Sequence, residues 1–90
     1  MSAAPDEMTE YDHFAAARGY ESTCELDDAM KAYEEAIALN PNFAKAWYYK
    51  ALLHYKEKEF EQATTCAKKV MELKPVWEKH VKKYMPDLVI

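Results

Sequence analysis

Glycine is almost absent from this chain of 90 residues, which contains a single one, Gly19. Phosphate-cradling loops and the tight turns of dinucleotide-binding folds need several glycines at fixed spacing, so we expect no nucleotide-binding loop. Long apolar runs are also missing, since the longest has four residues and a membrane-spanning helix needs about 20. No segment is therefore predicted to cross a membrane.

Residues that bind metals or form covalent intermediates are few. Cys24 and Cys66 form no CxxC pair, and residues 1–7 have neither the basic nor the apolar segment of an export signal. We therefore expect reduced thiols in a cytoplasmic protein. The three histidines lack the short spacing that places two imidazoles on one helical face, and nothing places a base or an oxyanion donor beside either thiol. The sequence predicts no metal site, no cofactor and no catalytic residue.

The charges are unevenly distributed along the chain. Residues 1–43 hold ten acidic and two basic side chains, a net charge of −8, whereas residues 44–90 hold ten lysines and six acidic side chains, a net charge of +4. A nucleic acid is not an expected partner, because one half of the molecule would repel phosphate. Three interpretations of this charge asymmetry remain open: a solvated surface without a specific role, attraction of an acidic ligand toward one end, or head-to-tail contact between copies of the chain.

A repeat of 34 residues organises the chain. Pro41 and Pro75 each end a similar segment, and residues 10–43 align on 44–77 without a gap, small residues on small and large on large. Apolar residues recur at i, i+3, i+4 and i+7, which is the period of an amphipathic helix. After a disordered lead at residues 1–7, we predict helices near residues 8–22, 26–39, 43–57, 60–73 and 76–84. Turns are expected at the prolines, because the residue before a proline avoids the helical conformation.

These features resemble the tetratricopeptide repeat, whose pattern has an early Trp, a small residue, a Tyr, a later Ala and a closing Pro. The second unit carries it in the run Ala46-Trp47-Tyr48-Tyr49 and then in Tyr55, Phe60, Ala63 and Pro75. The first unit matches at Ala17, Tyr20, Leu26, Ala29, Tyr33, Ala36 and Pro41, and both units depart from the family at a few positions: His13, Ala16, Lys50, His54 and Ala67.

The resemblance covers residues 10–77 and implies an all-α fold, a right-handed stack of antiparallel helix pairs with five helices. We expect a first repeat at 8–43, a second at 44–77, and a capping helix with a tail at 78–90. Five alanines are predicted to be buried where helices cross closely: Ala17, Ala29, Ala36, Ala51 and Ala63. The resemblance also implies a role in protein–protein recognition and not in catalysis.

The family places the first helix of each pair on the concave side of the stack. This implies a groove bordered at its far end by lysines and lined by residues of the first and third helices: Tyr11, Phe14, Arg18, Lys45, Tyr48, Tyr49, Leu52 and Tyr55, with Lys79 and Lys83 at the border. Aromatic side chains are enriched at protein-binding surfaces, and lysines favour acidic segments. We therefore expect an acidic peptide segment of a partner protein in this groove. The competing interpretation is that several of these aromatic rings only pack the helices together.

Some members of the family clamp a terminal carboxylate with Lys-x-x-x-Asn in the first helix, Asn in the third and Lys-x-x-x-Arg in the fifth. Lys79 and Lys83 have the spacing of the last pair. Phe14 and Arg18 occupy the first-helix positions, however, and Tyr49 occupies the third-helix position. The clamp is therefore partial at best, and recognition of a chaperone tail is not predicted.

An alternative function is self-association. Two repeats are fewer than the roughly three that usually form a stable stack. The tail residues Leu88, Val89 and Ile90, together with Trp77 and Val81, would then form an apolar patch that a second copy covers in a weak homodimer. The tail could instead be presented to a groove that reads C-termini, or fold back onto the last helix, which is the arrangement we favour.

Overall fold

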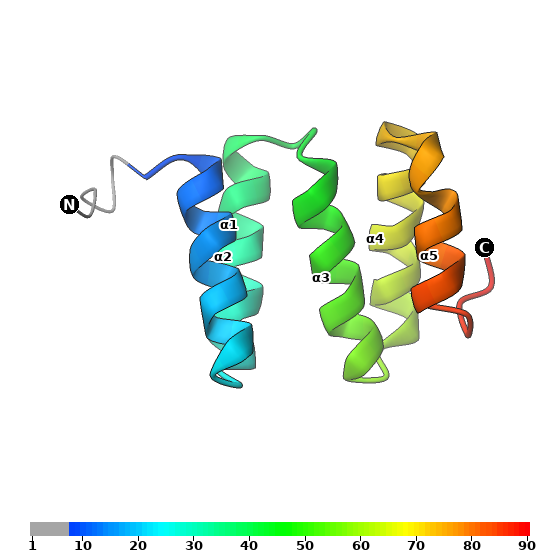
Figure 1. Cartoon of the computed structure of the whole chain (residues 1–90), viewed down its shortest axis with the longest axis horizontal. Coiled ribbons are helices and arrows are strands. Elements are labelled where there is room, and N and C mark those ends of the chain that lie inside the picture. The colour runs from blue at the N-terminus through cyan, green and yellow to red at the C-terminus, as the bar shows by residue number, and fades with distance from the viewer. Residues whose placement is uncertain (1–7) are drawn as a thin grey trace. The chain divides into compact units, whose positions relative to one another are not determined.

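The computed structural model describes residues 8–90, and in that range it contains five α-helices and no strand (Figure 1). A 3₁₀ turn, η2, precedes the last helix, and the elements in chain order are α1 Glu10–Ser22, α2 Leu26–Leu39, α3 Ala44–Lys56, α4 Phe60–Leu73, η2 Pro75–Trp77 and α5 Glu78–Tyr84. The prediction of an all-α chain with five helices is confirmed. The disorder predicted for residues 1–7 lies outside the described residues.

Three helices begin later than the sequence pattern suggested, α3 by one residue and α1 and α5 by two. Local hydrogen bonding and proline geometry explain the two larger differences. Thr9 caps α1: its hydroxyl oxygen accepts from the Asp12 backbone N–H at 3.2 Å, and the Asp12 carboxylate accepts from the Thr9 backbone N–H at 2.9 Å. This reciprocal capping box fixes the start of the helix at Glu10. At the other end of the chain, Pro75 opens the 3₁₀ turn η2, so α5 begins only at Glu78.

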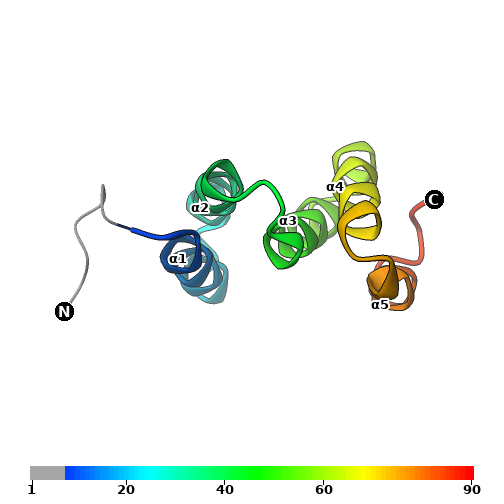
Figure 2. The ribbon, with the colours of Figure 1, turned by 90° about the horizontal axis from the view of Figure 1, so that it is seen from above.

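The chain divides into two compact units, Met1–Pro41 and Asn42–Ile90. In the first unit α1 and α2 pack against each other along their lengths, and in the second α3 pairs with α4 in the same way. Figure 2 shows each pair nearly end-on, with α5 as the third helix of the second unit. The repeat boundary at residues 43 and 44 stays a prediction.

The two helix pairs turn with the same backbone geometry. Cys24 and Lys58 have left-handed φ angles of 61° and 62° and are 34 positions apart. In each turn the next residue donates its N–H to the carbonyl five positions earlier, Glu25 at 2.8 Å and Glu59 at 2.9 Å. This is the Schellman arrangement that ends helices with one left-handed residue. The period of 34 read from the sequence is therefore present in the backbone.

The residues before the two prolines also match. Asn40 has φ −143° and ψ 90°, and Lys74 has φ −141° and ψ 85°. Both conformations are extended, because the proline ring excludes the helical region for the preceding residue. Helices α2 and α4 therefore end at equivalent positions, as the sequence predicted.

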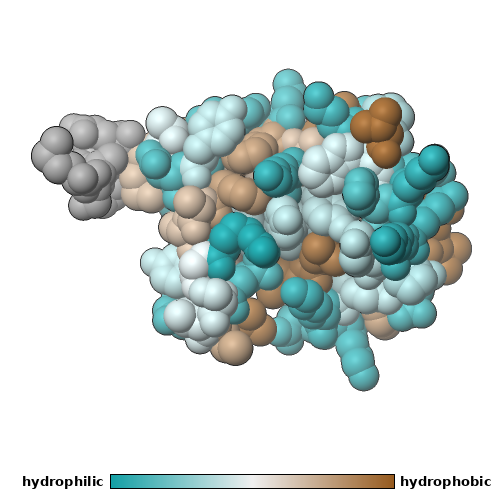
Figure 3. Space-filling model, in the orientation of Figure 1, coloured by the Kyte–Doolittle hydropathy of each residue, from teal (hydrophilic) through white to brown (hydrophobic). Residues whose placement is uncertain are grey.

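The cores consist largely of small residues. The five alanines predicted at close helix crossings are all fully buried. Beside them the first unit buries Tyr33, whereas the second forms a cluster across its three helices: Tyr48, Ala51, Cys66, Ala67, Val70, Val81 and Met85. Cys66 is reduced, as is the exposed Cys24. Hydrophilic residues cover much of the face shown in Figure 3, with hydrophobic residues in smaller groups between them.

The C-terminal tail folds back onto its own unit. Met85 is buried, Leu88 packs partly buried against the same cluster, and the Asp87 carboxylate accepts a hydrogen bond of 2.7 Å from the Tyr55 hydroxyl. The prediction that Val81 would contribute to an exposed patch is wrong, because Val81 and Met85, one turn apart, cover the α3–α4 pair. Val89 remains 91% exposed. Self-association through the tail stays a prediction, and the apolar surface available for it is smaller than expected.

None of the helices within residues 8–90 combines the length and the apolar character required to span a bilayer.

Replacing Ala63 by leucine should lower the free energy of unfolding by about 1–3 kcal/mol, because the added methyl groups overpack a fully buried position of α4. Urea unfolding followed by circular dichroism measures the change. The matched control is Ala38→Leu on the exposed side of α2, which should leave stability nearly unchanged. Equal stability of the two variants would contradict the burial of Ala63 at a helix crossing.

Replacing Lys58 by glycine should raise the free energy of unfolding by about 1 kcal/mol. A left-handed conformation costs a non-glycine residue about 1–2 kcal/mol, and the greater freedom of glycine in the unfolded chain offsets only part of the gain. Thermal melting monitors the effect. Lys68→Gly, in the middle of α4, should lower stability by about the same amount, and a loss of stability in Lys58→Gly would rule out the left-handed turn.

Candidate functional site

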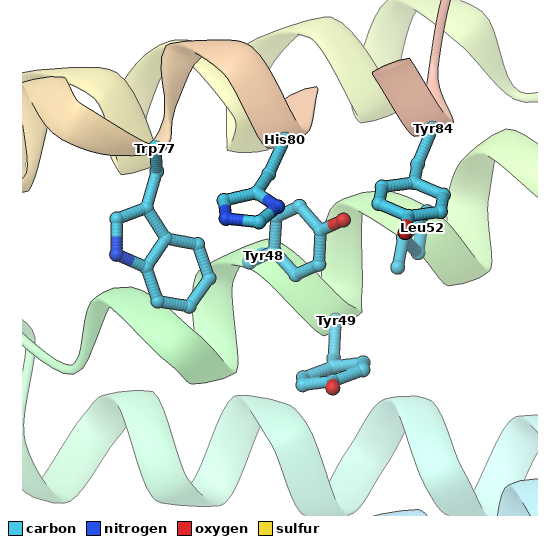
Figure 4. Close-up of a pocket in the computed structure, with 6 residues that line it drawn as sticks. All are labelled: Tyr48, Tyr49, Leu52, Trp77, His80 and Tyr84. Atoms are coloured by element: carbon cyan, nitrogen blue, oxygen red, sulfur yellow. The ribbon is translucent and has the colours of Figure 1, made fainter. Parts of the chain in front are cut away.

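The second unit contains an open hollow of about 340 Å³ between α3 and the η2–α5 segment. We call it the aromatic hollow, and its lining residues are Tyr48, Tyr49, Leu52, Trp77, His80 and Tyr84 (Figure 4). Tyr48 and Leu52 share one side of α3 because they are four residues apart, and the same spacing aligns His80 with Tyr84 on α5. Two helices thus present aromatic side chains to one cavity.

The rings of the hollow contact one another mainly edge to face. Tyr48 meets Tyr49 at a centroid distance of 5.4 Å and 81°, and Trp77 at 5.1 Å and 72°. His80 lies between Trp77 at 6.0 Å and Tyr84, on which it stacks at 6.4 Å and 9°. Aromatic pairs in these arrangements contribute stabilising energy in addition to that from the apolar area they bury. The walls therefore hold one another in place.

Tyr48 and Tyr84 differ strongly in exposure although both line the hollow. The side chain of Tyr48 is only 7% exposed and belongs to the core cluster. Its pKa is raised above the ordinary value chiefly because burial disfavours the phenolate. Tyr84 is 51% exposed. The packing interpretation thus describes Tyr48 well, whereas Tyr84 offers its surface to solvent.

Lys83 places a positive charge beside the hollow, and two further lysines lie on α5. The Lys83 ammonium lies 5.3 Å from the centroid of the Tyr84 ring. Lys82 pairs with Glu78 at 2.9 Å, and Lys79 is exposed on the same helix. No acidic residue is among those that line the hollow. The electrostatic potential there therefore favours an anionic or neutral ligand.

The structure brings together three of the predicted site residues and adds three that the sequence analysis did not assign to the site. Tyr48, Tyr49 and Leu52 were predicted to face a groove, and all three line the hollow. Trp77, His80 and Tyr84 were missed, although they recur at i, i+3 and i+7 near the end of the chain. That helical spacing of aromatic residues was the signal that could have identified them.

Tyr55 and Lys45 do not line the hollow. The ring of Tyr55 packs edge to face on Phe60 at 5.4 Å, and its hydroxyl donates to Asp87 of the tail. This hydrogen bond raises the pKa of Tyr55. Lys45 is exposed at the beginning of α3. In the structure Tyr55 therefore anchors the tail, and its predicted role in a groove remains untested.

Two of the predicted residues of the first unit, Phe14 and Arg18, lie beside the buried Tyr33. The Arg18 guanidinium pairs with the Glu21 carboxylate at 2.9 Å, and the same carboxylate accepts a hydrogen bond from the Tyr33 hydroxyl. The ring of Phe14 lies 6.0 Å from that of Tyr33. Tyr11 is 64% exposed on α1. A groove shared by these residues and those of α3 stays a prediction.

The first unit has a smaller hollow of about 180 Å³ with charges of both signs, lined by Met8, His13, Ala16, Tyr20, Asp28, Lys31, Ala32 and Glu35. Within it the His13 imidazole pairs with the Glu35 carboxylate at 2.9 Å. Among residues 8–90 no group of three His, Cys, Asp or Glu side chains is arranged to hold a metal ion. The mixed charge gives this hollow no clear ligand preference.

Folding stability should fall above about pH 10 because of Tyr33. Burial and the hydrogen bond to Glu21 raise the pKa of Tyr33, so the unfolded state loses the proton first as the pH rises through the ordinary tyrosine pKa of about 10. Denaturant unfolding between pH 8 and pH 11 should show a shallower decline for Tyr33→Phe than for the wild type. The exposed-site control Tyr11→Phe should retain the full decline. A wild-type stability that does not change with pH would contradict the raised pKa of Tyr33.

Comparison with known proteins agrees with the geometry. A family model described as "TPR repeat" matches residues 25–58, and a second, "Tetratricopeptide repeat", matches residues 44–75. The Hsp70-Hsp90 organising protein of Plasmodium falciparum (isolate 3D7) is 33% identical over 67 residues, which are 73% of this chain and 12% of that protein. No solved structure matches the chain.

The two matched ranges overlap and together span α2, α3 and α4. The backbone turns of the two helix pairs repeat at the family's period of 34 residues. Repeats of this kind form helical solenoids. The chain belongs to the tetratricopeptide-repeat family, and this relationship indicates a protein–protein interaction module.

Proposed function

We propose that the chain binds a peptide segment of a partner protein in the aromatic hollow. The observation that carries this proposal is the convergence of five aromatic side chains and one leucine from α3, η2 and α5 on one open cavity. Its volume of about 340 Å³ lies at the lower end of the roughly 300–1,000 Å³ typical of small-molecule sites. A cavity of this size suits one or two side chains of a peptide.

The rest of the predicted site would flank this anchor point. Lys79 and Lys83 on α5 and Lys45 on α3 are exposed, and would meet acidic residues of the peptide. Tyr11, Phe14 and Arg18 of the first unit, together with Tyr55, would extend the contact if the peptide is long. Rim charges of this type chiefly affect association rate and salt dependence, whereas central aromatic residues dominate affinity.

The name of the Plasmodium relative suggests Hsp70 and Hsp90 as the first partners to test. The residues of this chain do not complete the carboxylate clamp of the family, because Tyr49 stands at the third-helix position and Phe14 and Arg18 stand in the first helix. A chaperone that binds here would therefore use a mode of contact other than the clamp.

The double variant Tyr49→Ala, Tyr84→Ala should lose the partners that the wild type captures from a cell extract or from purified Hsp70 and Hsp90. Each central aromatic residue removed should weaken binding by more than about 1 kcal/mol. The matched control is Val76→Ala, Val89→Ala, which truncates two highly exposed side chains outside the hollow. Circular dichroism shows whether each variant is folded, and capture of the same partners by all three proteins would refute the assignment.

A further inference from the structure

We infer that the segment bound in the aromatic hollow has an aromatic side chain as its anchor, flanked by carboxylates, and that it binds as an internal stretch of chain. This inference rests on the proposed function and specifies the chemistry of the ligand. It follows from the lining of the hollow, the position of the lysines and the absence of a carboxylate among the lining residues.

The lining favours an uncharged aromatic anchor. The ring of Tyr84 is half exposed, and the edges and faces of Trp77 and His80 are held by neighbouring rings. Leu52 adds an aliphatic contact from α3 (Figure 4). A ring that enters the hollow can adopt the edge-to-face and stacked arrangements that the walls already use with one another. A small side chain would leave most of these contacts unmade.

Aromatic cavities also bind cations, and the local charge argues against a cation here. The Lys83 ammonium already lies 5.3 Å from the centre of the Tyr84 ring. Glu78 compensates Lys82, whereas neither Lys79 nor Lys83 makes an ion pair within residues 8–90. The second unit as a whole has ten lysines and six acidic residues. A positively charged anchor would be repelled, and carboxylates beside a neutral anchor would be attracted.

The same charges place the carboxylates at the rim of the hollow and not within it. The polar atoms of the lining are phenol hydroxyls, an indole N–H and an imidazole, whereas the lysines project from the exposed part of α5. Side-chain carboxylates on either side of the anchor can reach the lysines without a chain terminus. Binding should therefore be indifferent to whether the end of the peptide is free or amidated.

The test is a nuclear magnetic resonance titration of the full chain with synthetic peptides. The parent probe is an acetylated and amidated Glu-Glu-Phe-Glu-Glu peptide. Four relatives carry alanine or trimethyl-lysine in place of phenylalanine, glutamine in place of every glutamate, or a free C-terminal carboxylate. Chemical shifts locate the site, and the titrations give dissociation constants at low and high salt.

The parent peptide should shift the signals of the Trp77 indole, His80 and Tyr84. The alanine and trimethyl-lysine peptides should bind at least fivefold more weakly than the parent. The glutamine peptide should bind more weakly, and its affinity should not depend on salt. The peptide with a free C-terminal carboxylate should differ from the parent by less than twofold in affinity. Tyr84→Ala should weaken the parent at least fivefold and Val76→Ala should not. Lys83→Ala should weaken binding at low salt, with Lys68→Ala of α4 as its control.

Other results would separate the two ideas. The inference is wrong if the alanine or trimethyl-lysine peptide binds as tightly as the parent or more tightly, or if binding requires the free carboxylate. In these cases the proposed function is still supported as long as the signals of the hollow shift. The inference is also wrong if none of the peptides binds. The proposed function is then decided by whether the Tyr49→Ala, Tyr84→Ala protein still captures the partners of the wild type. If that variant keeps all partners, both are wrong.

Discussion

Close packing of helices over alanine is the constraint on which the rest of this structure depends. Ala17 and Ala29 in the first unit, and Ala51 and Ala63 in the second, are fully buried. Without bulky side chains at these positions, paired helices can approach closely and place their larger residues at the sides of the contact. With one glycine in 90 residues, the chain achieves this with alanine and so keeps high helix propensity.

The second unit becomes a candidate binding site because α5 docks on the α3–α4 pair. Val81 and Met85 lie inside the shared cluster, and Leu88 and the Tyr55–Asp87 hydrogen bond hold the tail. Because Val81 and Met85 are buried on one side of this segment, the aromatic residues His80 and Tyr84 on another side face the hollow that α3 also lines. The apolar contact that stabilises the unit thus also forms the wall of the hollow.

Much of the candidate site could be predicted, and the misses have physical causes. Tyr48, Tyr49 and Leu52 were identified because their helix matched a repeat whose concave side is known from the family. The side of α5 that lines the hollow was not identified, because the repeat pattern ends at residue 77 and gives no register for the helix beyond it. Tyr55 lies on the same helix as Leu52, but its hydroxyl is held by Asp87, 32 residues away. A contact between such distant residues leaves no local pattern.

The sequence by itself determined the five helices, the period of 34 residues and the buried alanines. These features depend on local preferences: hydrophobic periodicity, the restriction imposed by Pro41 and Pro75, and the small volume of alanine. Tertiary structure alone decided that Val81 is buried, that the tail returns to Tyr55, and that Trp77, His80 and Tyr84 share a cavity with α3. Those outcomes depend on which side of the last helix meets the pair, and that choice is made by the packing of side chains far apart in the chain.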